Sequence, residues 1–214
     1  MPFSIESIKT ALADREGRAF DSAEKRASVA LMLRTNEARR SEHVSGTEVF
    51  IIRRARNERD PWSGHMAFPG GRHEPTDTDL SFTARRETHE ETGLQIASHE
   101  QLGKIDDVQG RSKGRSIGLV ISCYVFGVGE SGFATPALNY EVDECFWVPI
   151  EWFTDPDRQM RYQPPQPHTD EYAGVRITDD PADVVWGLTY RFMTDFHTRL
   201  GHELPATAAD IRQD

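Results

Sequence analysis

The residues most able to do chemistry lie in one stretch, residues 68–94. An FPGG turn precedes a charged segment that contains Arg86, Glu87, Glu90 and Glu91. On a helix, residues three and four apart share a face, so this spacing predicts three carboxylates side by side. Their repulsion would be relieved by a divalent cation, because carboxylate oxygens are hard ligands that suit Mg²⁺ or Mn²⁺. The pattern therefore predicts a metal site made by the three glutamates.

The plainer alternative is a solvated, glutamate-rich helix, and a single pair of adjacent glutamates would favour it. The glycines at positions 70 and 71 argue against it, because they stand directly before the carboxylate-bearing segment. Glycine permits close approach of the backbone to a ligand, and an ordinary turn after Pro69 would not explain this position. We therefore expect Gly70 and Gly71 to contact the substrate.

The segment 86–94, RETHEETGL, resembles the REUxEExGU core of the Nudix box, in which U is an aliphatic residue. Thr88 stands at one of the aliphatic positions. Gly71 matches the box glycine, with one residue more before Arg86 than the standard box has, and this longer loop is similar to that of the coenzyme A pyrophosphatase branch. The remaining box acid has three candidates, which are more typical of charges and a cap at a helix start than of ligands: Glu74, Asp77 and Asp79.

The resemblance implies a metal-dependent hydrolase that acts on acid anhydrides in phosphorus-containing compounds. It implies an α/β fold, the Nudix α/β/α sandwich with a mixed β-sheet. The metal ligands would be Glu87, Glu90 and Glu91, with Mg²⁺ or Mn²⁺ as cofactor. Arg86 would hold a box glutamate in place by a charge-assisted hydrogen bond, although a surface ion pair with Glu90 is an alternative.

The general base is left open by the sequence. Glu91 is one candidate, acting through a metal-bound water. An acid from a distant segment is the other, and Glu141 and Glu144 lie at the start of a predicted strand, where many Nudix relatives carry such an acid. Of these two, Glu141 is the first choice, and a solvated strand start is its alternative.

The substrate is predicted from residues 50–71, FIIRRARNERDPWSGHMAFPGG, which occupy the place of a motif that marks coenzyme A pyrophosphatases. Gly64 and the FPGG turn agree with that motif, whereas Trp62 replaces a histidine. Coenzyme A or its thioesters are therefore the first prediction, and ADP-ribose or a dinucleoside polyphosphate is the alternative. Arg54 is a candidate for binding phosphate, as are Arg53, Arg56 and Arg59, and Trp62 is a candidate for stacking on a base. A solvated basic loop is the plainer interpretation of Arg54 and its neighbours.

Two rival functions come from other classes. An isomerase of the isopentenyl diphosphate type shares the fold and needs a catalytic cysteine, but Cys123 and Cys145 lie in apolar runs typical of buried thiols. A nucleotide-binding regulator would bind its ligand without turnover. Such proteins typically add a DNA-binding domain, and neither end of this sequence is basic or long enough to supply one.

The whole sequence predicts one domain over residues 1–214, with an N-terminal helical extension at 1–45 and the Nudix box at 68–94. The net charge of −10 argues against nucleic-acid and anionic-membrane partners, which favour a basic face. No run of eighteen apolar residues and no signal-peptide pattern is found. We expect a cytoplasmic protein with a small-molecule nucleotide substrate, and a homodimer is possible.

The expected elements follow from apolar periodicity. Residues 4–14 predict a helix, and 23–33 predict either a second helix or the first strand. Residues 106–116 predict a polar loop, and 155–180 a loop that holds a hairpin with 172–178 as one arm. Residues 183–200 predict an amphipathic helix, and the tail beyond 201 is expected to be loosely ordered. Strands are expected at 48–54, 65–68, 95–104 (with a turn), 117–128 and 144–150.

Overall fold

A computed structural model describes residues 3–15, 17–20, 25–40, 45–57, 62–112, 115–165 and 170–205. Its helices are α1 (Ile5–Ala13), α2 (Leu80–Thr92) and α3 (Gly187–Arg199). Its strands are β1 (Lys25–Thr35), β2 (Thr47–Arg54), β3 (Met66–Ala67), β4 (Gly70–Arg72), β5 (Gln101–Lys104), β6 (Val108–Ser112), β7 (Arg115–Gly127), β8 (Val142–Pro149), β9 (Gln159–Tyr162), β10 (Tyr172–Arg176) and β11 (Val184–Trp186). None of the helices in these ranges is long and apolar enough to cross a membrane.

The main sheet is mixed and is built around β1. This strand runs parallel to β7, with Lys25 opposite Leu119 and Leu33 opposite Gly127. Its other edge is shared by two antiparallel partners, β4 and β2. Strand β8 continues the sheet beyond β2, β3 pairs with Ile52 and Arg53 of β2, and β5 and β6 pair with β7. Because β4 carries Gly70 and Gly71, this topology places the FPGG turn against the centre of the sheet.

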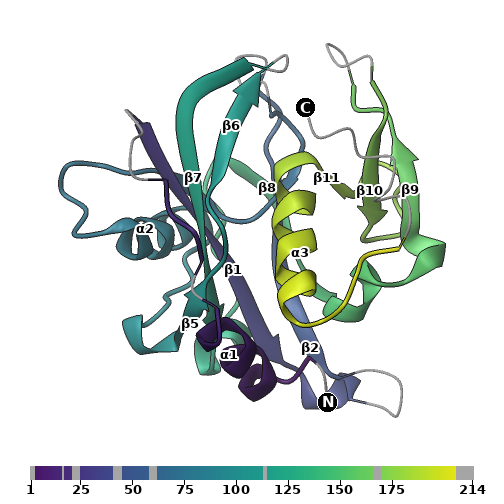
Figure 1. The fold of residues 1–214 in the computed structure, drawn as a ribbon, viewed down its shortest axis with the longest axis horizontal. Helices are drawn as coiled ribbons and strands as arrows, with labels where there is room; N and C mark the ends of the chain where they lie inside the picture. Colours follow the sequence, from purple (N-terminus) through teal and green to yellow (C-terminus); the bar gives the residue numbers. More distant parts are fainter. Residues whose placement is uncertain are drawn as a thin grey trace.

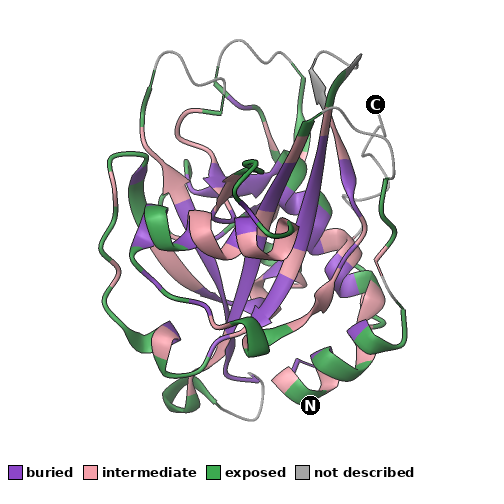
Figure 2. Cartoon of the chain, turned by 90° about the vertical axis from the view of Figure 1, so that its left-hand side faces the viewer, coloured by how far each residue is buried: buried purple, intermediate pink, exposed green. Residues whose placement is uncertain are grey.

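Helices cover both faces of the sheet, as Figure 1 shows, with α2 on one side and α1 and α3 on the other. Alternate residues of a strand face opposite sides. Accordingly, Ala30 and Met32 of β1 join one apolar cluster with Ala84 of α2, while Leu31 and Leu33 join a second cluster. The second cluster includes Ile8 and Leu12 of α1 and Phe192, Met193 and Phe196 of α3. Figure 2 looks onto the face covered by α2 and shows the long central strands buried. The predicted α/β/α sandwich with a mixed sheet is confirmed.

The first helix and the strand after it divide the predicted N-terminal extension. The helix predicted at 4–14 is confirmed as α1, which Ser4 caps by accepting a hydrogen bond from Ser7 N at 3.2 Å. The helical extension over 1–45 is wrong beyond this point, because Lys25–Thr35 is a strand of the sheet. Its apolar run is buried on both faces between α2 and α3, which an amphipathic surface helix would not be. The alternative of a first strand at 23–33 is therefore the one observed.

Two further predictions are corrected. The loop predicted at 106–116 is wrong for Val108–Ser112, which form β6 and pair with β7 from Val108 opposite Ile121 to Ser112 opposite Arg115. Residues 113–114 lie outside the described residues. Polar residues are typical both of loops and of strands at a sheet edge, so the polar composition of this segment does not distinguish the two. The helix predicted over 183–200 begins only at Gly187, whose φ is 61°. Before it, the β-branched Val184 and Val185 form β11 against β10.

A second, smaller sheet contains β9, β10 and β11, and lies at the right of Figure 1 beside α3. Strands β9 and β10 pair with Tyr162 opposite Tyr172, so the predicted hairpin within 155–180 is confirmed. Residues 166–169 between these strands lie outside the described residues, as do residues 206–214 of the predicted tail. The small sheet packs next to β3, the strand that directly precedes the FPGG turn.

Candidate active site

The FPGG turn has close contacts that explain both of its glycines. Gly70 has φ 154°, and a Cβ there would lie 2.3 Å from Ser28 O and 2.6 Å from Val29 Cα of β1. A Cβ on Gly71 would lie 2.4 Å from the carboxylate carbon of Glu87. Real side chains do not approach so closely. The first glycine therefore lets the turn pack on β1, and the second leaves room for the carboxylate of Glu87.

Helix α2 presents the box glutamates to this turn. Asp79 caps its start by accepting a hydrogen bond from Phe82 N at 2.7 Å, and Gly93 ends it with φ 71°. Thr88, which replaces an aliphatic residue of the Nudix pattern, is fully buried with its hydroxyl donating to Ala84 O at 2.7 Å. The helix thus tolerates threonine at this position because its own backbone satisfies the hydroxyl.

Arg86 connects the loop before α2 to two of the glutamates. Its Nε and one terminal nitrogen donate to the two oxygens of Asp77 at 2.8 and 3.0 Å. The other terminal nitrogen donates to Glu87 at 3.0 Å and to Glu90 at 3.2 Å. Both expectations for Arg86 therefore hold geometrically, because it contacts one box glutamate and forms an ion pair with Glu90.

Asp77 is a buried partner of Arg86, whereas the sequence predicts a charge or a cap at the helix start. Its side chain is fully buried, and it also accepts hydrogen bonds from Thr83 Oγ1 at 2.8 Å and Glu74 N at 3.0 Å. The hydrogen bond from Arg86 holds the pKa of Asp77 well below its usual range. Only Asp79 acts as the predicted cap. The sequence could not single out Asp77, because it lies in the loop before α2, outside the helical periodicity that would pair its side chain with Arg86.

Glu91 is the most buried of the three box glutamates, with its side chain 3% exposed. One of its oxygens accepts a hydrogen bond from Gly70 N at 2.9 Å, and Arg54 approaches the other at 4.0 Å. Burial raises the pKa of Glu91 to about 8, against the opposing effects of Gly70 and Arg54. The negative charges of Glu87 and Glu141 raise this pKa further. The site therefore holds more negative charge than its own residues neutralise.

The same surplus acts on Glu87, whose pKa is raised mainly by burial although Arg86 opposes the shift. Glu141 contributes to the raised pKa of Glu87 as well as to that of Glu91, so this acid lies near both. The backbone accounts for its position: Asn139 N donates to Glu91 O at 3.0 Å, and Ala55 N donates to Glu141 O at 2.8 Å. Glu144 instead forms an ion pair with Arg53. Of the two predicted distant acids, Glu141 is the one whose charge raises the pKa of Glu87 and Glu91.

The predicted substrate-binding residues have different surroundings. Arg54 lies in the carboxylate cluster, whereas Trp62 lies in the turn before β3 with 51% of its surface exposed. Arg53, considered together with Arg54 as a phosphate contact, has its nitrogens hydrogen-bonded to three carboxylates. Arg59 lies outside the described residues. Gly70 and Gly71 contact Glu91 and Glu87, and their contact with a substrate stays a prediction.

The fit of these residues to a divalent cation follows from their chemistry. Within the described ranges, no group of three or more Asp, Glu, His or Cys side chains is arranged so that it could hold a metal ion. Glu87 and Glu90 share one nitrogen of Arg86, while Glu91 is turned to Gly70. The donors are nevertheless hard carboxylate oxygens, and two of them have raised pKa values that a cation would lower. The donor types therefore suit Mg²⁺ or Mn²⁺, although the three carboxylates are not gathered around one point among the described residues.

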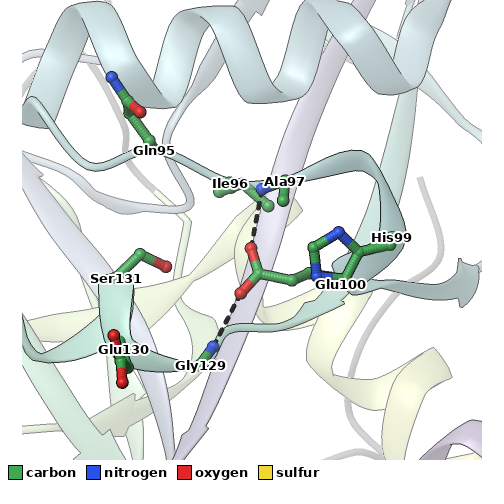
Figure 3. Close-up of a pocket in the computed structure, with 8 residues that line it drawn as sticks. All are labelled: Gln95, Ile96, Ala97, His99, Glu100, Gly129, Glu130 and Ser131. Atoms are coloured by element: carbon green, nitrogen blue, oxygen red, sulfur yellow. Dashed lines mark hydrogen bonds between the residues drawn. The ribbon is translucent and has the colours of Figure 1, made fainter.

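The cavity drawn in Figure 3 lies elsewhere. Its volume is about 490 Å³, and Glu100 spans it by accepting hydrogen bonds from Ala97 N at 2.7 Å and Gly129 N at 2.8 Å. Its lining residues are Gln95, Ile96, Ala97, His99, Glu100, Gly129, Glu130 and Ser131. None of them is a box glutamate or Arg54. The candidate site is therefore identified by its charge surplus and not by this cavity.

Both cysteines have surroundings that oppose a reactive thiolate. Cys123 is fully buried, and burial raises its pKa well above the usual value. Cys145 is half-buried, and burial raises its pKa as well. Catalysis by a cysteine needs a lowered pKa. The isomerase rival therefore has no support from the geometry of either thiol.

Comparison with known proteins identifies the family. Residues 25–168 match the model of the NUDIX domain. The mouse peroxisomal coenzyme A diphosphatase NUDT7 is 32% identical over 120 residues, which cover 54% of this chain and 44% of that protein. A probable nudix hydrolase of Schizosaccharomyces pombe is 31% identical over 147 residues, which cover 67% of this chain and 47% of that protein. The chain thus spans less than half the length of these curated relatives.

A solved structure supports the fold. The MutT/nudix family protein from Enterococcus faecalis superimposes with a TM-score of 0.57 at 15% identity, covering 97% of this chain and 75% of that one. At this identity the likeness concerns the fold alone. The family match over 25–168 includes the FPGG turn, α2 and the segment with Glu141. The chain belongs to the NUDIX domain family.

Proposed function

We propose that this chain is a metal-dependent hydrolase that cleaves a diphosphate linkage in a nucleoside diphosphate derivative. The observation that carries this proposal is the buried Glu91, held by Gly70 N in a cluster of acids that Arg86 and Arg54 only partly neutralise. A buried carboxylate with only a structural role would be neutralised by a basic side chain. This surplus of negative charge suits a cation that in turn binds the oxygens of a diphosphate.

The residues of the chain have separate tasks in the proposed reaction. A divalent cation held by Glu87, Glu90 and Glu91 would neutralise charge that develops on the diphosphate oxygens. Asp77 and Arg86 orient the glutamates, and Arg54 binds a substrate phosphate beside Glu91. Glu141 accepts the proton of the attacking water, and Glu91 is the alternative base.

Coenzyme A and its thioesters are the proposed substrates. Support comes from the length of the loop between Gly71 and Arg86, and from the likeness to a mouse coenzyme A diphosphatase. The exposed Trp62 stands where the coenzyme A motif has a histidine, and it would stack on the base. ADP-ribose and dinucleoside polyphosphates are the alternative substrates within the same reaction class.

Product analysis tests the proposal. Coenzyme A, ADP-ribose, NADH, a diadenosine polyphosphate and a nucleoside triphosphate would be incubated with the protein and Mg²⁺ or Mn²⁺. We expect 3′,5′-ADP and phosphopantetheine from coenzyme A, and no turnover with a chelator. Preferential cleavage of another compound would move the substrate to that class. Binding without cleavage of any compound would favour the regulator, and a fully active Glu87→Gln variant would overturn the metal site.

A further inference from the structure

Arg53 and Arg54 are adjacent in β2 but have different partners. Arg54 approaches Glu91, whereas Arg53 forms ion pairs with three carboxylates from two other segments. Nε of Arg53 donates to Asp143 Oδ2 at 2.9 Å, and one terminal nitrogen donates to Asp183 Oδ1 at 2.8 Å. The other terminal nitrogen donates to Glu144. Arg53 is therefore a junction between β2, β8 and the segment before β11.

The first of these contacts is made at an irregularity of the sheet. Arg53 pairs with Glu144 and Arg54 pairs with Val142, so Asp143 is an additional residue in β8. Such bulges bend a strand and redirect the side chains beside it, and they occur often next to active sites. Glu141 lies immediately before this bulge, with its carbonyl held by Ala55 N at 2.8 Å. The direction of Glu141 thus depends on how the bulge is held.

The second contact anchors the junction. The side chain of Asp183 is 4% exposed, and its other oxygen accepts a hydrogen bond from Thr178 Oγ1 at 2.7 Å. A buried carboxylate with both oxygens bound has little freedom to move. Asp183 leads into β11 and α3, and Thr189 of α3 donates to Met66 O of β3 at 3.2 Å. The C-terminal elements are therefore attached to β2 and β3 of the main sheet at two points.

We propose that Arg53 is a positioning residue of the hydrolytic site. By joining Asp143 and Glu144 to Asp183, it holds the bulge that directs Glu141 toward Glu91. The C-terminal sheet then braces the site through Asp183, although Asp183, β10, β11 and α3 lie beyond the matched family region. This inference rests on the proposed role of Glu141 in hydrolysis, and its first test needs no substrate.

Hydrogen exchange of the Ala55 amide reports directly on the Glu141 segment. In Asp183→Asn, the charge that anchors Arg53 is lost, and we expect the Ala55 amide to exchange about tenfold faster. Glu48→Gln is the matched control, because Glu48 is a 1% exposed carboxylate at the start of β2 that pairs with Arg34 and Arg39. Equal Ala55 exchange rates in the two variants, at equal loss of stability, would overturn the proposal.

Kinetics supply the second test. We expect Asp183→Asn to lower kcat about tenfold with little change in KM, and Glu48→Gln to leave kcat unchanged. If Arg53 acts through Glu141, Asp183→Asn has no further effect on kcat in a Glu141→Gln background. Additive losses in the double variant would show a merely structural role and overturn the proposal.

Two outcomes separate this inference from the proposed function. A fully active Glu141→Gln variant would remove Glu141 from the reaction, and with it the reason to position this acid. Normal Ala55 exchange in Asp183→Asn, together with a strongly impaired Glu141→Gln, would leave the proposed function intact and overturn only the role of Arg53. If Asp183→Asn does not fold, Asp143→Asn removes the contact at the bulge, where the side chain is 56% exposed. The same two measurements then apply.

Discussion

Two clusters of acidic and basic residues, one around Asp106 and Asp107 and one around the box glutamates of α2, balance charge differently. In the Asp106–Asp107 cluster, Asp106 pairs with Arg18 at 2.8 Å and with Arg199, and Asp107 pairs with Lys104 at 2.6 Å. Burial acts to raise the pKa of Asp106, but hydrogen bonds from Arg18 and the charge of Arg199 outweigh it, so the pKa is lowered. In the box cluster on α2, burial prevails and the pKa of Glu91 is raised to about 8.

The difference teaches how to separate structural from functional acids in this molecule. Asp107 has a buried side chain, yet Ser122 Oγ and Phe20 N donate to it at 2.7 and 3.0 Å in addition to its ion pairs. Asp106 and Asp107 are thus saturated with partners and contribute to stability. Glu91 is equally buried but has one backbone donor and an arginine at 4.0 Å. A buried carboxylate left in this state marks a functional site.

The largest expected effect comes from replacing one carboxylate of each cluster by its neutral amide. Glu91→Gln should lower kcat by about 10²–10⁴-fold, because a cation ligand and candidate base is lost. The same variant should unfold at a higher temperature than the wild type in chelator at pH 9, since it has no charge to bury. Enzyme assays and thermal unfolding measure the two effects.

Asp106→Asn should give the opposite pair of results. Its arginine partners lose their carboxylate, so we expect a loss of about 1–3 kcal/mol in the free energy of unfolding. At a temperature well below unfolding, kcat should stay at the wild-type value. The comparison fails if Glu91→Gln is active and unstable, or if Asp106→Asn is stable and inactive.

A smaller effect should follow from loosening Arg86. Asp77→Asn removes the buried carboxylate that binds two nitrogens of Arg86, and should lower kcat about 10-fold and weaken Mn²⁺ binding measured by calorimetry. Asp79→Asn is the matched control, because it makes the same change of charge two residues away and asparagine caps a helix equally well. Equal Mn²⁺ affinities of the two variants would mean that Asp77 does not orient the box glutamates.

A further effect is a pH dependence of stability in metal-free protein. The pKa of Glu91 is about 8 in the folded chain and about 4.3 in the unfolded one. The folded state therefore binds more protons between these values, and the free energy of unfolding should fall as pH rises, by at most about 1.4 kcal/mol per pH unit.

Urea unfolding at pH 5–9 in chelator measures this slope. Glu91→Gln should lack the part of the slope that comes from Glu91, and Asp106→Asn should keep it. Added Mg²⁺ should reduce this slope by stabilising the carboxylate. An identical slope in the wild type and Glu91→Gln would contradict the assignment of the raised pKa to Glu91.

Local sequence patterns were sufficient to predict the helix of the Nudix box and most of the strands. The helix that carries Glu87, Glu90 and Glu91, its cap at Asp79 and its end at Gly93 follow from residues close in sequence. The strand predicted at 117–128 is confirmed within β7. Periodicity was insufficient where burial depends on distant partners: β1 allowed two interpretations, β6 resembled a loop, and β11 was included in a helix.

The candidate site, like the fold, was predicted only in part from the sequence. The sequence indicated which acids could bind a cation, but it ranked Glu141 only just ahead of a solvated residue and treated Arg53 and Arg54 alike. In the structure, Ala55 N holds the Glu141 segment beside Glu91, while Arg53 forms its ion pairs with Asp143, Glu144 and the distant Asp183. Opposite faces of one strand and a bulge in its partner produce this difference, and neither is visible in composition.

The sequence by itself determined the fold class, the position of the box helix and the identity of its carboxylates, because helix spacing and glycine turns act over a few residues. The tertiary structure alone decided which acids are neutralised. Asp77, in the loop before α2, pairs with Arg86, Asp106 pairs with Arg18 and Arg199 from distant segments, and Glu91 has Arg54 at 4.0 Å. Charge balance is a property of residues brought together from distant positions, and in this protein it separates the candidate site from the scaffold.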